Sequence, residues 1–198
     1  MASARDVAAF LIAESGGMTG YQLQKLLYYA QAWHVAWTGA PLFGEQIEAW
    51  PKGPVVPDVF KEYSRQYTIT KATSGDPEKL NALEERAVRE VLRAYAPFTP
   101  GQLVELSHRE RPWRDARHGL SAEAPSKAPI SVESLREYFV SREPMRILPE
   151  QERGFRVLLA LPEDEASVVD DSDYVDADEH LKWLETGDGT PWPSDWSN

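Results

Sequence analysis

A long helix with marked ends constrains the fold more than any other feature of the sequence. It includes "QLQKLLYYAQAWHVAW", residues 22–37. Thr19 and Gln22 form a T-x-x-Q capping box at its start, and Gly39 stands where a left-handed residue commonly ends a helix. Apolar residues follow one face at helical spacing: Leu23, Leu26, Leu27, Ala30, His34 and Trp37. A helix with such a face needs a surrounding core, which predicts a mainly α-helical, compact domain.

Three residues of this helix do not fit a simple apolar stripe. Tyr28 and Tyr29 point about 100° apart, so we expect at least one to reach a surface or a second packing layer. Lys25 stands among leucines, and its ammonium is expected to bond a backbone carbonyl or a carboxylate. His34, alone on an apolar face, is more typical of a satisfied core residue than of a metal ligand.

Start and stop signals predict further helices along the chain. They are a helix from Ser3 to Ser15, one starting at Pro57-Asp58, one capped by Asp76 and running to Tyr95, one capped by Thr99 and Gln102, and one from Ser131 to Phe139. The stretch "PLFGEQIEAWPKGPVVPDVF" is too rich in glycine and proline for a long helix. Residues 47–50 are predicted to form a short extended element there.

The charge divides the chain into two parts. The 198 residues carry a net charge of −11. Residues 149–198 hold fourteen acids and three bases, whereas residues 1–148 hold eighteen of each. We therefore expect a helical domain over residues 1–140 and an acidic C-terminal extension over residues 141–198. Within the extension, residues 155–162 read as a strand and residues 176–187 as a short helix.

Composition excludes several classes of function. No apolar run is long enough for a membrane span, and no signal peptide is evident. The absence of cysteine removes disulfides and thiolate zinc sites, which is typical of a cytoplasmic protein. Nucleic-acid binders usually show a basic face, so the neutral charge of residues 1–148 argues against one alternative, a nucleic-acid-binding regulator of its own operon. The four histidines are too dispersed to indicate a metal site, and no cofactor motif is present.

The sequence contains no complete catalytic motif. "HRE" at residues 108–110 has the H-x-E pattern of a zinc deaminase, but the required cysteines are missing. Phosphate-loop, zinc-protease and serine-hydrolase patterns are absent as well. We therefore do not expect an enzyme. An alternative stays open, in which His108, Glu110 and Trp113 line a pocket for a small molecule.

Three stretches, in this order, carry a resemblance to a known family. They are "MTGYQLQKLLYYAQAWHVAWTGAPLF", "IEAWPKGPVVPDVFKEY" and "LVELSHRERPWRDAR". Together they resemble the Panacea domain of SocA-like and GepA-like phage-associated proteins, over about residues 5 to 140. The matching residues are Leu23, Lys25, Leu26, Tyr28, Tyr29, Glu48, Ala49, Trp50, Gly53, Pro54, Val55, His108, Pro112 and Trp113.

The resemblance implies a mostly helical fold with a small extended element and an antitoxin function. Such a domain binds and neutralises a protein toxin encoded beside it, and some of these toxins handle nucleotides or block translation. An alternative, from one SocA-like branch, is an adaptor that delivers its toxin to a protease. The resemblance transfers no catalytic residue, and a small-molecule enzyme remains a third interpretation.

For the motif residues, a structural role and a partner-binding role both stay open. We expect Lys25 and Tyr29 to lie near the loop from Trp50 to Val55, with Lys25 bonding loop carbonyls. Gly53 would allow a positive φ or a close backbone approach, and Pro54 would shape the turn. His108 and Trp113 would plug the core or join the partner surface.

The acidic extension departs from the family pattern. It could cover the basic groups of a nucleotide- or tRNA-handling toxin, with Trp183, Trp192 and Trp196 as apolar anchors. Alternatively, it packs its strand and helix on the body and is otherwise solvated.

Overall fold

The computed structural model describes residues 1–142 of the chain. This part contains seven α-helices: α1 Ala4–Ser15, α2 Gly20–Thr38, α3 Pro57–Tyr63, α4 Ala82–Tyr95, α5 Pro100–Arg109, α6 Arg111–Ala116 and α7 Val132–Ser141. Its strands are short: β1 Met18–Thr19, β2 Ile47–Trp50, β3 Gly53–Val55, β4 Thr68–Ile69 and β5 Pro129–Ile130. The fold is mainly helical with a small sheet, as predicted. The predicted strand at 155–162 and helix at 176–187 lie outside the described residues.

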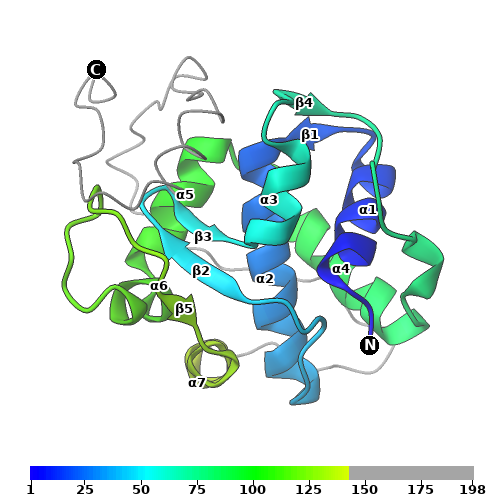
Figure 1. The fold of residues 1–198 in the computed structure, drawn as a ribbon. Helices are drawn as coiled ribbons and strands as arrows, with labels where there is room; N and C mark the ends of the chain where they lie inside the picture. Colours follow the sequence, from blue (N-terminus) through cyan, green and yellow to red (C-terminus); the bar gives the residue numbers. More distant parts are fainter. Residues whose placement is uncertain (143–198) are drawn as a thin grey trace.

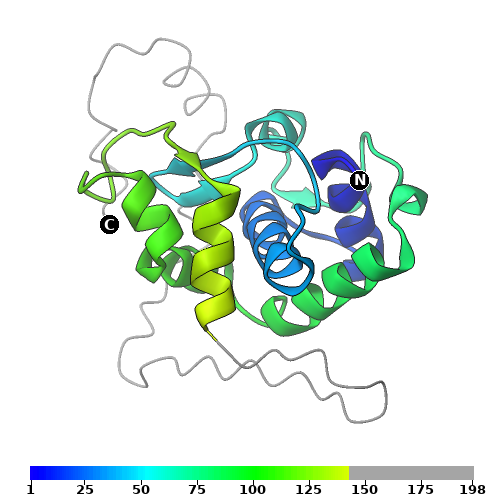
Figure 2. The same ribbon diagram turned by 90° about the horizontal axis from the view of Figure 1, so that it is seen from below.

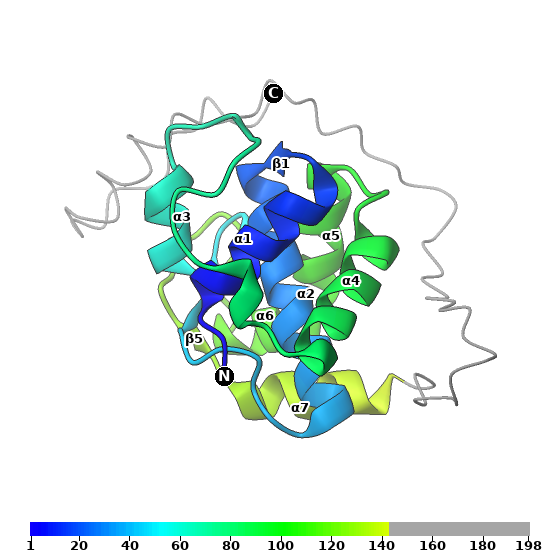
Figure 3. The ribbon, with the colours of Figure 1, turned by 90° about the vertical axis from the view of Figure 1, so that its right-hand side faces the viewer.

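Helix α2 is the central element, and the other helices surround it (Figures 1, 2 and 3). It packs against α1, α4, α5 and α7 and against strand β3. Every residue from Leu23 to Val35 is buried. The expectation of a single apolar face was therefore too narrow, because neighbours cover the whole circumference. Four polar residues, Gln24, Lys25, Gln31 and His34, are buried with the leucines, as expected for His34.

Local capping explains where several helices begin and end. The capping box of Thr19 and Gln22 is formed, and Gly39 ends α2 with φ of 76°. Ser3 and Asp6 form the same arrangement at α1, and Thr99 caps α5. These side chains satisfy backbone N–H groups that have no partner within the helix, so the predicted starts of α1, α2 and α5 are confirmed.

The start of α4 differs from the prediction. Asp76 and Pro77 begin only a 3-10 turn, η1, over Pro77–Lys79. Leu80 is extended, and α4 starts after Asn81, whose side chain forms a capping box with Glu84. Two capping signals compete within six residues. The second has the reciprocal acidic partner that the first lacks, and it sets the helix start.

The small sheet joins distant parts of the chain. Strands β2 and β3 form an antiparallel hairpin in which Trp50 faces Gly53, and β5 pairs antiparallel with the other edge of β2 (Figure 1). A separate two-stranded pair joins β1 to β4. Sequence analysis missed β1, β3, β4 and β5, because strands of two or three residues are too short to show alternation. Within residues 1–142, no helix combines the length and the apolar character that crossing a membrane requires.

Candidate functional site

The hairpin of β2 and β3 is bound on one side by buried polar groups of α2. The Lys25 ammonium donates a hydrogen bond to the Pro54 carbonyl at 3.0 Å, and the Lys25 side chain is fully buried. One residue earlier, the Gln24 side-chain oxygen accepts from the Val56 amide at 2.8 Å. The two bonds hold the backbone on both sides of Val55. The predicted contact between Lys25 and the loop is confirmed.

Gly53 lets the hairpin come this close to α2. Its φ is +94°, a conformation that side-chain-bearing residues rarely adopt. A Cβ at this position would lie 2.6 Å from Cε of Lys25 and 2.8 Å from Oγ of Ser107. Both reasons expected for Gly53, a positive φ and a close approach, are present.

Helix α6 and the residue after it bind the hairpin from the other side. The Trp113 indole N–H donates to the Trp50 carbonyl at 3.0 Å. The Arg117 guanidinium donates to the Ala49 carbonyl at 2.8 Å and lies 4.7 Å over the Trp113 ring. It also donates to the carbonyls of the following loop, at Ser121, Ala122 and Ala124. The hairpin is thus clamped between two helices by side chains that bond its backbone.

Arg117 is the residue of this clamp that sequence analysis missed. It is only 1% exposed, and its pKa is lowered by burial. Arginine is almost never fully buried unless it is paired, so composition gave no reason to select it. The spacing of four residues from Trp113 is a local signal that could have indicated a shared helical face.

His108 lies flat against Trp113 inside the clamp. Their ring centroids are 3.9 Å apart with an interplanar angle of 15°. Burial, with further contributions from the charges of Lys25 and Arg117, lowers the pKa of His108 to about 3. The imidazole is therefore neutral at physiological pH. Its Nε2 atom is buried without a hydrogen-bond partner among residues 1–142.

The adjacent tyrosines of α2 have different surroundings. The Tyr28 hydroxyl donates to the Glu110 carboxylate at 2.7 Å, at the junction of α5 and α6. Tyr29 instead stacks on Tyr95 of α4, with ring centroids 3.9 Å apart. Both side chains are fully buried, so they occupy two packing layers and neither reaches the surface. The ring of Tyr29 also meets Phe139 edge to face, and its predicted proximity to the hairpin stays a prediction.

Two ionisable groups of this region have pKa values that burial moves close to neutrality. Burial lowers the pKa of Lys25 to about 7. It also raises the pKa of Glu110 to about 7, although the hydrogen bond from Tyr28 acts in the opposite direction. They do not form an ion pair with each other, because Lys25 bonds a carbonyl and Glu110 bonds a tyrosine. In each case burial disfavours the charged form, so the charge of the group changes near pH 7.

The three residues of the small-molecule alternative, His108, Glu110 and Trp113, are engaged by neighbouring side chains. His108 packs on Trp113, whereas the Glu110 carboxylate is engaged by Tyr28. Among the described residues, no group of three or more histidine and acidic side chains is placed to hold a metal. Trp50, Pro54, Val55 and Trp113 are buried like Lys25 and the tyrosines. A protein partner would therefore contact exposed residues around the clamp and not these buried side chains. Trp183, Trp192 and Trp196 lie outside the described residues.

Comparison with known proteins agrees with the resemblance of the motifs. A family model described as "Antitoxin SocA-like, Panacea domain" matches residues 23–114. The chain is also 30% identical over 128 residues to Antitoxin SocA of Caulobacter vibrioides (strain NA1000 / CB15N), covering 56% of this chain and 68% of that protein. This chain belongs to the SocA-like antitoxin family. No solved structure matches it.

The Panacea-domain match covers most of the hairpin clamp. It starts at Leu23 in α2 and ends at Arg114 in α6, so it includes Lys25, Gly53 and Trp113. Arg117 and helix α7 follow the matched segment. The matched part of this SocA-like chain therefore contains most of both helices that bind the hairpin. It includes the hydrogen bonds from Lys25 and Trp113 to the hairpin backbone.

Proposed function

We propose that this protein is an antitoxin that neutralises a cognate protein toxin by direct contact. The observation that carries the proposal is the alignment with Antitoxin SocA, which covers 68% of that protein. The clamp supports it in a structural way. Lys25, Gly53 and Trp113 fix the hairpin against α2 and α6, so the clamp presents the outer surfaces of these elements in a fixed arrangement.

The first experiment concerns the neighbouring open reading frame. Expressed alone it should arrest growth, and co-expression of this chain should restore growth. The two purified proteins should form a complex of fixed stoichiometry. If no adjacent product is toxic, or if a toxic product neither binds this chain nor is neutralised by it, the proposal fails.

A non-enzymatic mechanism has its own signature. A stoichiometric inhibitor neutralises at most a fixed number of toxin molecules per chain, so toxin activity should fall linearly to zero at the equivalence point. Substoichiometric neutralisation with turnover, lost on His108→Ala, would instead indicate catalysis by the region around His108. Because His108 stacks on Trp113, the folded state of that variant must be checked by circular dichroism.

The acidic extension is the part of the chain best suited to a basic toxin. Residues 163–179 hold nine acids and no Lys or Arg. Toxins that handle nucleotides or tRNA present basic groups to phosphate, and an acidic segment can cover these groups and accelerate association. Trp183, Trp192 and Trp196 would add apolar contacts. A chain truncated after residue 148 should then bind its toxin more weakly, with a smaller salt dependence, than the full chain.

Delivery to a protease is the second candidate, and it rests on the same family membership. Direct blockade and delivery differ in the fate of the toxin. Direct blockade leaves the toxin at full length in a stable complex, so its half-life in cells should be unchanged or longer. Delivery shortens that half-life only while the protease is present. Measuring the toxin half-life with and without this chain, in cells with and without ATP-dependent proteases, separates the two mechanisms.

A further inference from the structure

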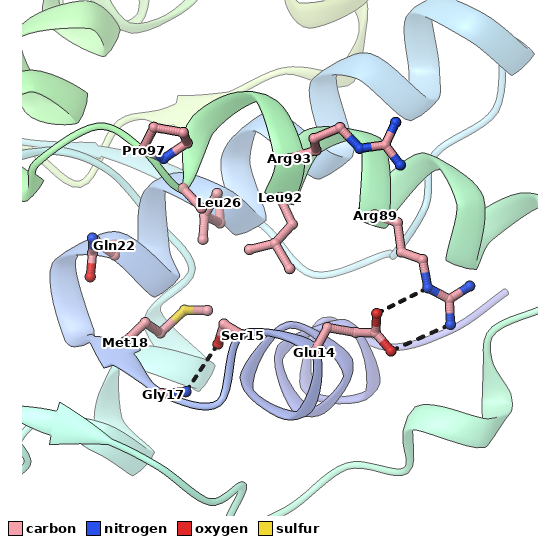
Figure 4. A pocket seen from close by; sticks show the side chains of 11 residues that line it. Glu14, Ser15, Gly17, Met18, Gln22, Leu26, Arg89, Leu92, Arg93 and Pro97 are labelled. Carbon is pink, nitrogen blue, oxygen red and sulfur yellow. Dashed lines mark hydrogen bonds and ion pairs between the residues drawn. The ribbon is translucent and has the colours of Figure 1, made fainter. Parts of the chain in front are cut away.

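A groove lies between three helices on a face away from the hairpin clamp. It is formed by the end of α1, the start of α2 and the second half of α4 (Figure 4). Its volume is about 540 Å³, within the range of pockets that bind small ligands. The lining residues are Glu14, Ser15, Gly17, Met18, Gln22, Leu26, Arg89, Leu92, Arg93, Ala96 and Pro97.

The floor of the groove is apolar and its rim is charged. Leu26 and Leu92 lie across the groove from Met18 (Figure 4). At one end, Arg89 is paired with Glu14 at 3.0 Å. The Arg93 side chain, 65% exposed, lies at the rim and pairs with Glu90 only along the surface of α4. Such a site suits an aromatic side chain, because methionine sulfur and arginine both make favourable contacts with aromatic rings.

We propose that this groove binds the segment "TPWPSDW", residues 190–196 of the same chain. The segment carries two of the seven tryptophans of the protein, Trp192 and Trp196. Pro191 and Pro193 flank Trp192 and disfavour a helix in this segment. Asp195 places a carboxylate beside Trp196, which fits a rim that contains Arg93.

The length of the chain allows this contact. Helix α7 ends at Ser141, about 48 residues before Thr190. A chain extends up to about 3.3 Å per residue. By contrast, a body of this size has a radius of gyration of roughly 14 Å. The segment can therefore reach any face, and the covalent link gives it an effective concentration of about 1 mM. A modest affinity is enough to keep the groove occupied.

The absence of cysteine in the natural chain makes a direct test possible. A spin label attached at Ser197→Cys in the full-length protein should broaden nearby amide signals in NMR spectra. We expect the signals of Gly17, Met18 and Ala96 to lose most of their intensity. Amides in the loop after α6, on the opposite side of the body in Figure 1, should keep theirs. Equal broadening on both sides, or no broadening at the groove, overturns the proposal.

Matched variants separate the groove from general charge effects. Gln22→Glu places a carboxylate at the groove yet keeps the capping box, because glutamate serves at this position as well as glutamine. It should weaken the broadening at Gly17 and Met18. Gln102→Glu makes the same change in the capping box of α5, and it should have no effect. If both variants act alike, the contact is not specific to the groove.

Substitutions in the segment and a mixing experiment complete the test. Trp192→Ala with Trp196→Ala should abolish the broadening, whereas Trp183→Ala, a tryptophan outside the proposed segment, should preserve it. Isotope-labelled protein without a spin label is then mixed with unlabelled, spin-labelled protein. Signals broadened in this mixture would show that a second copy occupies the groove, which contradicts the intramolecular contact. The groove contact is proposed for the free protein and is tested without the toxin, which would have to displace Trp192 and Trp196 from the groove in order to contact them.

Discussion

The two sides of helix α2 are both buried, but they are held by different forces. Toward α4 and α7, rings do the packing: Tyr29 stacks on Tyr95, and Trp33 meets Phe139 edge to face at 4.9 Å. Toward the hairpin, Lys25 and Gln24 bond backbone groups of Pro54 and Val56. The aromatic side is stabilised mainly by contact area, which tolerates changes of shape that preserve volume. The hairpin side depends on the direction and identity of a few polar groups.

This difference explains why the distinctive residues concentrate on the hairpin side. A buried lysine without a carboxylate partner is costly, and a glycine with positive φ cannot be replaced without strain. Neither residue would be chosen for packing alone. Together they allow a backbone carbonyl to approach an amine inside the core, and this approach positions β2, β3 and the neighbouring α6. We therefore expect small substitutions on the hairpin side to lower the unfolding free energy more than equivalent substitutions elsewhere.

The largest expected effect is that of Gly53→Ala. The new Cβ meets Lys25 and Ser107 at distances under 3 Å and also suffers from the φ of +94°. Left-handed backbone strain and overpacking together should cost about 2–5 kcal/mol of unfolding free energy. Gly39→Ala is the matched control, because Gly39 has φ of +76° and no atom within 4 Å of a Cβ. It should cost only about 1–2 kcal/mol, from strain alone. If the two variants lose the same unfolding free energy in urea denaturation, the close approach of Gly53 to Lys25 does not contribute to the cost.

The second prediction concerns the buried amine. The pKa of Lys25 falls from 10.5 to about 7 on folding, so between these values the unfolded chain holds a proton that the folded chain has released. Stability therefore rises with pH through this window. Lys25→Met removes the effect. Relative to this variant, the natural protein should gain about 2 kcal/mol of unfolding free energy between pH 7 and 9.

The control for this prediction is Lys61→Met, which removes an exposed lysine of α3. Its unfolding free energy should follow that of the natural protein across the same pH range. A pH profile of Lys25→Met parallel to that of the natural protein would mean that the amine is not desolvated as the structure indicates.

Local signals in the sequence predicted much of the fold, but they did not predict the contacts between residues that are far apart in the sequence. Each capping box of the T-x-x-Q type lies within four residues, and the boxes of Thr19 and Thr99 correctly located α2 and α5. The burial of Gln24 and Gln31 depends on elements that surround α2, and no periodicity within α2 encodes it. The N-x-x-E box at Asn81 was present in the sequence, but the predicted helix start relied on Asp76 and Pro77 and did not use it.

For the site, the link between Lys25 and the glycine-proline turn could be predicted, because a lone lysine among leucines requires an acceptor. The bond from Tyr28 to Glu110 joins residues 82 positions apart, and Arg117 reaches Ala49 across 68. No spacing rule covers such pairs. They emerge only when the folded topology places α6 beside the hairpin.

A third prediction uses the carboxyl group at the end of α5. Burial raises the pKa of Glu110 from 4.5 to about 7, so the folded chain binds a proton that the unfolded chain has lost. This contribution to stability is fully present below pH 4.5 and is lost as the pH rises through 7. Glu110→Gln cannot ionise and keeps an oxygen for Tyr28. Relative to this variant, the natural protein should lose about 2 kcal/mol between pH 5 and 6.5. The control is Glu137→Gln, on the exposed face of α7, whose pH profile should match that of the natural protein.

The smallest expected effect compares the two adjacent tyrosines and tests the two sides of α2 most directly. Tyr28→Phe and Tyr29→Phe each remove one oxygen from a fully buried ring. Tyr28→Phe leaves the Glu110 carboxylate without its hydrogen bond, which should cost about 1–2 kcal/mol at pH 8. The hydroxyl of Tyr29 lies near the same carboxylate but makes no hydrogen bond of good geometry with a described residue, so Tyr29→Phe should change stability by less than about 0.5 kcal/mol. Because the Tyr28 bond also lowers the pKa of Glu110, Tyr28→Phe should move the loss of stability described above to higher pH. Equal costs for the two variants, with no such movement, would remove the distinction between a polar side and an aromatic side of the central helix.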